Sequence, residues 1–202
     1  MRKLIAQGAE SKLFLTGATI VKNRFSKKYR LKEIDEKLRK FRTKREAKIL
    51  RKLEAINFPS PKLIAEDGSE NIEIEYIKGR LLKGILEKKS YIPISREIAK
   101  NVAILHNNHI IHGDLTTSNM ILSKNNKIYF LDFGLGFFSH KLEDKAVDLH
   151  LLREALESKH YTIWEKCFKA VLQSYEKNAG NGKEVLKRVR IVENRGRYKG
   201  KK

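Results

Sequence analysis

The sequence predicts an α+β protein with two lobes, a small strand-rich lobe with one long helix and a second lobe built mainly from helices. Short apolar runs separated by turn residues fill the first 25 positions, the pattern of strands joined by tight turns. Apolar residues then recur at helical spacing over 31–56, with no glycine or proline inside. Helix-length periodic segments and one strand–turn–strand pattern make up the second lobe. The predicted parts are a first lobe at 1–78, a second lobe at 79–186 and a basic tail at 187–202.

The elements of the first lobe follow from local signals. Two turns, Gln7-Gly8 and Thr16-Gly17, separate three short apolar runs that we expect to be strands. The long helix stops before Pro59, because proline cannot continue a helix. A further strand pair is expected around the turn Asp67-Gly68. The apolar positions of the helix are Leu31, Ile34, Leu38, Phe41, Ile49, Leu53 and Ile56.

The second lobe is predicted from one cap and three apolar faces. Ser95 is a plausible N-cap for a helix whose apolar face includes Ile98. A polar turn at 123–127 separates two apolar runs that predict a hairpin. Helices are expected at 143–157 and 160–178. The side chains expected in the core from the last helix are Trp164, Phe168, Val171, Leu172 and Tyr175, together with the thiol of Cys167.

Charge is concentrated in two places along this chain of 202 residues with a net charge of +20. Residues 22–52 hold 15 Lys/Arg against 4 Asp/Glu, and residues 187–202 hold 8 against 1, whereas 53–186 balance at 18 against 18. A solvated charge run explains either segment alone, but two of them around a neutral middle favour a polyanion such as nucleic acid. With one cysteine, no zinc-ligand spacing and no membrane or secretory segment, we expect a cytoplasmic protein without disulfides.

The strongest chemical signal is the run from His112 through Asp114 to Asn119, followed by the predicted hairpin and then Asp132-Phe133-Gly134. Phosphoryl transfer requires positioning and neutralisation of charge. An aspartate on a loop orients the attacking hydroxyl, and an asparagine five residues later reaches a magnesium ion. A second carboxylate at the end of the hairpin holds the metal that bridges the phosphates. Asp114, Asn119 and Asp132 fit these three roles in that order, which predicts a site for ATP and Mg²⁺.

The first lobe supplies candidate nucleotide-binding residues. Lys22, on a predicted strand, is expected to contact the phosphates, and Glu46 on the long helix is expected to pair with it. Surface pairs along the helix are the alternative for Glu46. The phosphate-covering turn has one glycine where such loops carry three. A hinge is expected to meet adenine through the carbonyl of Glu75 and the amide of Ile77. The predicted strand and turn residues at the nucleotide are Ile5, Gln7, Gly8, Ala9, Glu10 and Ser11.

The whole chain resembles the small atypical serine/threonine kinase subunit of the KEOPS (EKC) complex, the p53-related-kinase family, which is related to the RIO kinases. That family implies a two-lobed protein-kinase-like fold with a reduced second lobe. The segments that carry the resemblance are Gly8-Ala9-Glu10, His112-Gly113-Asp114-Leu115-Thr116, Asp132-Phe133-Gly134-Leu135, Glu143-Asp144-Lys145-Ala146-Val147-Asp148-Leu149 and Arg195-Gly196-Arg197.

The resemblance implies a function and a set of partners. In the family, the complex makes threonylcarbamoyladenosine in tRNA, and the kinase subunit binds the threonylcarbamoyl transferase subunit and a small regulatory subunit. It implies autophosphorylation and ATP hydrolysis, with Asp114 as the catalytic aspartate and Asn119 and Asp132 as metal ligands. Asp148 would be a buried anchor for the catalytic-loop backbone, the alternative being a helix N-terminal charge. His112 and Gly134 are expected to support the structure of the site. The tail is expected to be mobile and to bind RNA or a partner through Arg195, Arg197, Lys199, Lys201 and Lys202.

The sequence lacks parts that ordinary protein kinases use to dock peptides. Only 16 residues separate Asp132 from Asp148, and no Ala-Pro-Glu motif occurs. Gly113 stands where an arginine would receive an activation-loop phosphate. We therefore expect that broad peptide phosphorylation is not the main task.

Three other interpretations stay open from the sequence. A RIO-type ribosome-assembly kinase would share the catalytic residues. A small-molecule phosphotransferase of the aminoglycoside or choline type also uses a His-Gly-Asp loop, but with a larger and more acidic second lobe. A pseudokinase scaffold that binds tRNA and partner subunits is favoured only by the glycine-poor turn, since every catalytic side chain is present.

Overall fold

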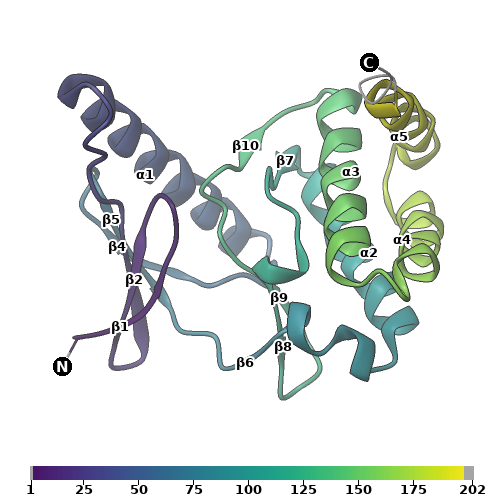
Figure 1. Cartoon of the computed structure of the whole chain (residues 1–202), viewed down its shortest axis with the longest axis horizontal. Coiled ribbons are helices and arrows are strands. Elements are labelled where there is room, and N and C mark those ends of the chain that lie inside the picture. The colour runs from purple at the N-terminus through teal and green to yellow at the C-terminus, as the bar shows by residue number, and fades with distance from the viewer. Residues whose placement is uncertain (1, 198–202) are drawn as a thin grey trace. The chain divides into compact units, whose positions relative to one another are not determined.

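The computed structural model describes residues 2–197, which divide into two compact units. The first unit runs to Lys78 and includes Phe133–Leu135. The second unit comprises Gly79–Asp132 and the described chain from Gly136 onward (Figure 1). The first unit is a sheet with one long helix, and the second is mainly helical. The predicted α+β class is therefore confirmed.

The first unit is built on one antiparallel sheet of five strands in the order β1-β2-β3-β5-β4. Lys22 lies on the central strand, opposite Leu13 on one side and Ile72 on the other. Because β3 is paired with a strand on each side at this position, the backbone of Lys22 is fixed within the sheet. The strands are β1 (Arg2–Gln7), β2 (Lys12–Thr16), β3 (Thr19–Asn23), β4 (Leu63–Glu66) and β5 (Asn71–Glu75).

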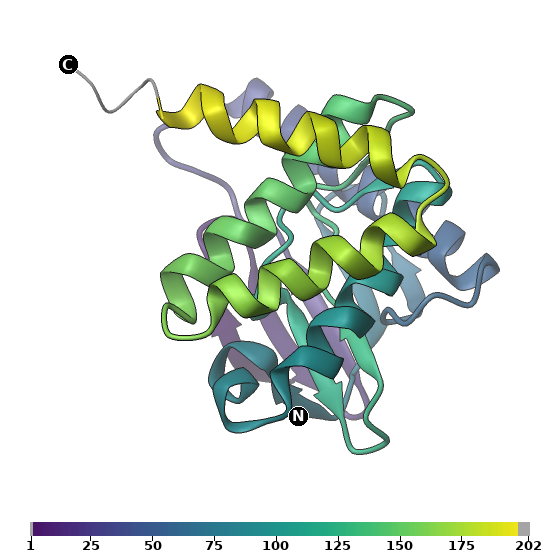
Figure 2. The ribbon, with the colours of Figure 1, turned by 90° about the vertical axis from the view of Figure 1, so that its right-hand side faces the viewer.

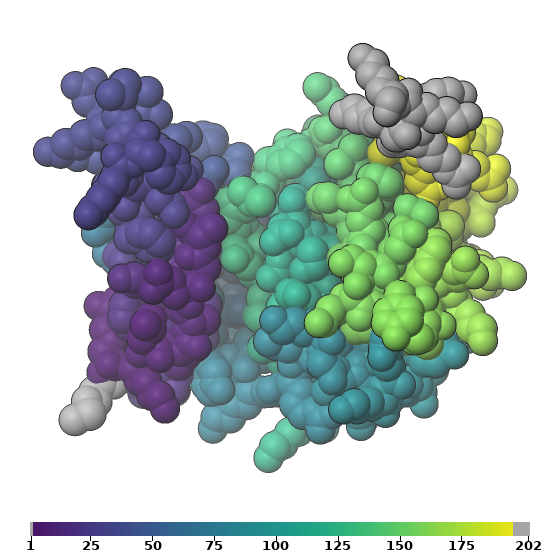
Figure 3. Space-filling model, viewed as in Figure 1, coloured from purple at the N-terminus to yellow at the C-terminus, as the bar shows by residue number. Residues whose placement is uncertain are grey.

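Helix α1 (Lys32–Ala55) packs on β4 and β5, and all its buried residues except Asp35 lie from Thr43 onward. Ile49 and Leu53 are fully buried there. The predicted apolar stripe also includes Ile34 and Phe41, yet these side chains remain 51% and 58% exposed. Figure 3 shows the dark blue start of this helix at the surface. The predicted helical period is confirmed, and burial of the apolar stripe is limited to part of its length.

The second unit contains two small sheets around the loops of interest. One has the order β6-β8-β9 and includes the predicted hairpin, and the other pairs β10 with β7. Gly79 begins β6, where an added Cβ would lie 2.3 Å from a methyl group of Ile121. Strand β6 was not predicted, because a three-residue strand has no period to detect. The strands are β6 (Gly79–Leu81), β7 (Ile110–Ile111), β8 (Met120–Ser123), β9 (Ile128–Phe130) and β10 (Phe137–Phe138).

Most of the second unit is helical. Helix α2 begins at Tyr91, so Ser95 is not its N-cap; the Ser95 hydroxyl instead donates to the Tyr91 carbonyl at 2.7 Å. Pro93 is tolerated because the first turn of a helix leaves its N–H groups unpaired. None of the described helices is long and apolar enough to cross a membrane. The helices are α2 (Tyr91–Asn107), α3 (Leu142–Lys159), α4 (Trp164–Asn178) and α5 (Gly182–Arg197), with short 3₁₀ turns η1 (Leu82–Gly84), η2 (Leu86–Lys88) and η3 (Thr117–Asn119).

The predicted mobile tail is helical as far as the structure describes it. Helix α5 packs on α3, as Figure 2 shows, and buries Val185 and Val189. These two valines lie one helical turn apart on the same face, a signal that the surrounding basic residues obscured. Arg188 and Arg195 both pair with Glu143 of α3, at 3.2 and 2.5 Å. The prediction of a mobile arm was wrong for residues 187–195.

Candidate active site

The β8–β9 hairpin positions two of the predicted site residues in the second unit. Met120 pairs with Phe130, and the Leu131 amide donates to the Asn119 carbonyl at 2.8 Å. Asn119 therefore lies just before one strand, and Asp132 comes just after the partner strand. The first and last residues of an antiparallel hairpin lie side by side. Asn119 and Asp132, thirteen positions apart in the sequence, therefore lie at the same end of the sheet.

Asn119 also joins the hairpin to the predicted catalytic aspartate. Its amide nitrogen Nδ2 donates to the carbonyl of Asp114 at 2.9 Å and to Oδ2 of the same residue at 2.8 Å. Both amide hydrogens are thereby directed at Asp114, which leaves the oxygen Oδ1 as the ligand atom of Asn119. Asp114 is partly buried and Asp132 is exposed.

The residues present fit a magnesium ion. Asn119 Oδ1 and the carboxylate of Asp132 are oxygen donors, the type that Mg²⁺ requires. Within residues 2–197, no group of three or more His, Cys, Asp and Glu side chains forms a metal cage. Magnesium is ordinarily held by one or two protein oxygens together with phosphate oxygens and water, so two ligands on this loop match that ion better than zinc.

Two residues of the loops have backbones in the left-handed region. Asp132 has φ 56° and Gly113 has φ 77°. Aspartate tolerates this conformation better than most side chains, whereas a long side chain in place of Gly113 would be strained. Gly134 has no such φ; it is buried, and its carbonyl accepts from Arg45 at 3.5 Å.

Asp148, on α3, anchors the backbone of the catalytic loop. Its Oδ2 accepts from the amide of His112 at 2.8 Å, and its Oδ1 accepts from the amide of Gly113 at 2.9 Å. Asp148 is 1% exposed. Burial alone would raise the pKa of this carboxyl, but its hydrogen bonds and the nearby imidazoles hold the pKa below its usual value. The anchoring role that the resemblance implied matches this geometry, and a simple helix-end charge does not.

The ring of His112 connects the loop to the hairpin. Its Nε2 donates to the carbonyl of Leu131 at 3.0 Å, and its Nδ1 accepts from the amide of Asp114 at 3.3 Å. This pattern requires the neutral ring with the proton on Nε2. Complete burial lowers the pKa of His112 against the pull of nearby aspartates, which favours that neutral form. His112 thus orients Asp114 and does not contribute a charge.

A buried chain of side chains behind Asp148 was missed by the sequence reading. The Nε2 of His106, on α2, lies 3.2 Å from Asp148 Oδ2, and its Nδ1 lies 2.7 Å from the hydroxyl of Tyr175 on α4. Both side chains are fully buried, and burial raises the pKa of Tyr175. Tyr175 was expected only as a core residue. Its spacing along α4 signals burial but not a hydrogen-bond partner on another helix.

In the first unit, the predicted ion pair is present. The Nζ of Lys22 lies 2.9 and 3.1 Å from the two carboxylate oxygens of Glu46. Arg24 also pairs with Glu46 and donates to Thr43 at 3.2 Å. All four side chains are buried. Arg24 was not predicted, although it lies two residues after Lys22 and therefore on the same face of the strand.

The glycine-poor turn of the first unit is held by charged side chains. The Gly8 amide donates to the Ser11 carbonyl at 2.9 Å, and an added Cβ at Gly8 would meet only that oxygen, at 3.8 Å. The packing of the turn therefore does not itself require glycine at this position. Glu10 pairs with Arg30 and Arg42, each at 2.9 Å. Although burial opposes them, these arginines lower the pKa of Glu10. Ion pairs hold the turn without further glycines.

Comparisons with known proteins agree with this geometry. The model of the protein kinase domain matches residues 2–162. The KEOPS complex subunit Bud32 of Pyrococcus abyssi is 44% identical over 213 residues, which cover 98% of this chain and 96% of that protein. The chain belongs to the Bud32 family of protein kinases. A probable bifunctional tRNA threonylcarbamoyladenosine biosynthesis protein of Methanobrevibacter smithii is 42% identical over 96% of this chain and 36% of its own length.

Solved structures show the same fold. The Rio2 kinase of Chaetomium thermophilum, in a complex with ADP, Mg²⁺ and phosphoaspartate, superposes with a TM-score of 0.61 at 14% identity, covering 96% of this chain and 70% of that one. The bifunctional kinase-methyltransferase WbdD has a TM-score of 0.59 at 18% identity, over 84% of this chain and 42% of its own. These likenesses show the protein-kinase-like fold that the sequence predicted for this Bud32-family chain.

The remaining predicted residues lie in different settings. Ile5 is 42% exposed on β1. Glu75 ends β5, with its amide bonded to the Lys62 carbonyl at 2.9 Å, and Ile77 is buried near the end of the first unit. Gln7 and Ala9 are exposed beside Gly8. Arg195 is engaged with Glu143. The predicted tail residues that lie outside the described side chains are Arg197, Lys199, Lys201 and Lys202.

The two residues of the buried pair should respond differently to substitution. Lys22→Met removes one cation while Arg24 continues to neutralise Glu46, so we expect a folded protein whose ATP turnover falls by roughly a hundredfold. Glu46→Gln leaves two buried cations without this carboxylate, and we expect it to lower the free energy of unfolding by about 3–5 kcal/mol. ATP hydrolysis and urea unfolding of both variants separate the two effects. Equal destabilisation by both would contradict this account of the pair.

Proposed function

We propose that this Bud32-family chain is an ATP-dependent serine/threonine kinase and ATPase that acts as a KEOPS subunit in threonylcarbamoyladenosine modification of tRNA. The observation that carries the proposal is the joining of Asp114, Asn119 and the end of the hairpin by direct hydrogen bonds. This arrangement supports a site in which an aspartate and two oxygen ligands act together, as phosphoryl transfer requires of the protein. A pseudokinase scaffold would not need these side chains to be held in register.

The residues divide the chemistry among them. Asp114 orients and accepts the proton of the attacking hydroxyl or water. Asn119 and Asp132 would hold magnesium, which neutralises charge on the phosphate oxygens when bound. Lys22 would bind phosphate through its ammonium group, with Glu46 fixing its position. Autophosphorylation is expected, because a serine or threonine hydroxyl can replace water as the nucleophile.

The structure favours a narrow range of protein substrates. The segment after Gly134 pairs back at once, with Phe137 opposite Ile111, and α3 begins at Leu142. Little chain is left to form the extended platform on which ordinary protein kinases dock peptides. ATP hydrolysis coupled to a partner suits this short segment better than broad peptide phosphorylation.

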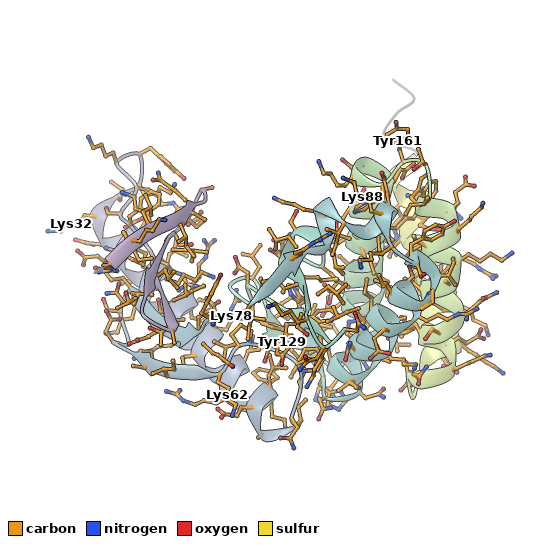
Figure 4. All side chains as sticks on the ribbon, turned by 90° about the horizontal axis from the view of Figure 1, so that it is seen from below. Lys32, Lys62, Lys78, Lys88, Tyr129 and Tyr161 are labelled. Carbon is orange, nitrogen blue, oxygen red and sulfur yellow. The ribbon has the colours of Figure 1, made fainter. Side chains whose placement is uncertain are left out.

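The proposed partners are the threonylcarbamoyl transferase subunit, a small regulatory subunit and tRNA, in the cytoplasm and without a membrane. Support comes from the names of the relatives, one of which unites a Bud32-like segment with a longer threonylcarbamoyladenosine biosynthesis protein in one chain. Lys32, at the start of α1, extends away from the helix in Figure 4. An exposed basic surface of this kind attracts phosphate backbones. The exposed basic residues of α1 are Lys32, Lys37, Lys40, Lys44, Lys48, Arg51 and Lys52.

The test is ATP hydrolysis by the purified chain, alone and with the transferase subunit plus tRNA, using Asp132→Asn as the blank. Turnover that rises at least tenfold with the partners supports an ATPase module in tRNA modification. Equal turnover with and without them, together with phosphate transfer to added protein, would instead identify an independent kinase. No turnover under either condition would favour the scaffold.

A further inference from the structure

Lys145 is a buried cation in the second unit to which the catalytic chemistry assigns no role. It lies in the first turn of α3 and is 5% exposed. No carboxylate among residues 2–197 forms an ion pair with it. The two acidic residues beside it are engaged elsewhere, since Glu143 pairs with Arg188 and Arg195, and Asp144 accepts from the Ser139 hydroxyl at 2.5 Å.

Two physical effects make this position unfavourable for an ammonium group. An ion removed from water is costly unless a counter-charge or hydrogen bonds replace the solvent. The first turn of a helix also carries the positive end of the helix dipole, which repels a cation. Burial accordingly lowers the pKa of Lys145. A negatively charged group from outside the chain would relieve both effects at once.

His109 adds a second unsatisfied group close by. Its Nδ1 is buried and has no hydrogen-bond partner among the described residues. Its ring stacks on that of His140, with the centroids 3.7 Å apart and the planes at 29°. Burial, together with the charges of His140 and Lys145, lowers the pKa of His109. Hydrogen bonds join the segments that carry these side chains: the amide of Ser139 donates to the His109 carbonyl, and the hydroxyl of Ser139 donates to Asp144, the residue before Lys145.

We propose that Lys145, His109 and His140 form a binding site for a phosphate group, either free phosphate or a phosphate monoester. The ammonium of Lys145 would supply the charge, and the ring of His109 would contribute a hydrogen bond once Nδ1 carries the proton. The N-terminal amides of α3 favour the same anion. None of the three side chains belongs to the set assigned above to ATP and Mg²⁺, so the inference does not depend on the proposed function.

The location gives the site a connection to the catalytic loop. The carbonyl of His109 accepts from the amide of Ser139 at 2.8 Å, beside the pairing of β7 with β10. Strand β7 then leads directly into His112. A phosphate bound to His109 and Lys145 would hold together the strand before the catalytic loop and the segment that follows Gly134.

Thermal unfolding of the full chain with inorganic phosphate as the probe tests the site, at constant ionic strength set with chloride. At a phosphate concentration a hundredfold above its Kd, we expect the wild-type Tm to rise by about 5–10 °C. Lys145→Met should abolish this rise while leaving the Tm in chloride equal to or above the wild-type value. Lys141→Met, which removes an exposed lysine just before the same helix, is the matched control and should keep the rise.

Phosphate can also bind at a nucleotide site, so the titration is repeated with Lys22→Met. A rise that persists in Lys22→Met and is lost in Lys145→Met supports the proposal. A rise lost in Lys22→Met, or an equal rise in wild type and Lys145→Met, would overturn it, as would no rise in the wild type. If Lys145→Met does not fold, the site is tested by the imidazole NMR signals of His109 in the wild type. Bound phosphate should shift these signals, and an unchanged spectrum contradicts the site.

Phosphoserine, titrated under the same conditions, distinguishes the two sources of the phosphate group. Tighter binding of phosphoserine than of inorganic phosphate assigns the site to a phosphorylated side chain. Tighter binding of inorganic phosphate assigns it to the free ion. If neither phosphoserine nor inorganic phosphate binds, at concentrations where chloride leaves the Tm unchanged, the proposal is wrong.

Discussion

Asp132→Asn is expected to reduce ATP hydrolysis by about 10²–10³-fold while the protein remains folded. In the proposed site the carboxylate would supply the charged oxygen ligand for magnesium, whereas an amide offers one neutral oxygen. Loss of a few kcal/mol of charge stabilisation at the phosphates corresponds to this range of rates. The measurement is steady-state ATP hydrolysis over a range of magnesium concentrations, together with nucleotide binding with and without the metal.

Asparagine is a better replacement than alanine at this position. Asp132 has φ 56°, a conformation that asparagine tolerates but that strains most other side chains. Alanine would confound loss of the ligand with a backbone shift. Glu154→Gln makes the same chemical change at an exposed carboxylate on α3 and should leave turnover unaltered. A wild-type rate for Asp132→Asn would remove Asp132 from the metal site.

Asp148→Ala is expected to lower the free energy of unfolding by about 3–5 kcal/mol. The substitution leaves the amides of His112 and Gly113 and the ring of His106 without their buried acceptor. For a chain of this length, that loss corresponds to a decrease in Tm of roughly 6–20 °C. Because the same amides hold the loop that carries Asp114, turnover should fall even at temperatures where the variant is folded.

Urea unfolding followed by circular dichroism measures the effect, with Glu154→Ala on the same helix as the control. The exposed pair of Glu154 with His150 should contribute less than about 1 kcal/mol. The pKa of Asp148 is lowered on folding, so its contribution is complete above the ordinary carboxyl pKa of 3.8 and is lost as the pH falls through the folded value. The difference between wild type and Asp148→Ala should therefore shrink only below about pH 3.8. A constant difference down to pH 2 would contradict the ionised anchor.

Elements with a strong local period were predictable from the sequence. The long helix was expected at 31–56 and is found at Lys32–Ala55, because an uninterrupted run of good helix formers needs little tertiary help. The hairpin before Asp132 was predicted as well. Strands β7 and β10 were not, since two residues each carry no period and form only because the chain pairs there.

Burial was not predictable from the sequence in the two charge-rich segments, because it depends on which other element packs against each helix. Residues 187–202 were predicted to be a mobile arm, although the described part of this segment belongs to α5, which packs on α3 and buries Val189. The apolar stripe of α1 was predicted from its spacing, yet its member Phe41 is exposed. In both cases the local pattern shows which face is apolar but not whether another element lies against it.

The sequence alone determined the fold class and the set of residues that make chemistry possible, because residue type and spacing decide which groups can be ligands or acids. Only the tertiary structure decided what each group contacts. It placed both amide hydrogens of Asn119 on Asp114 and set Tyr175 and His106 behind Asp148. It also buried Lys145 where no carboxylate of the described residues pairs with it. Burial and hydrogen bonding depend on residues far apart in the chain, so no local pattern contains them.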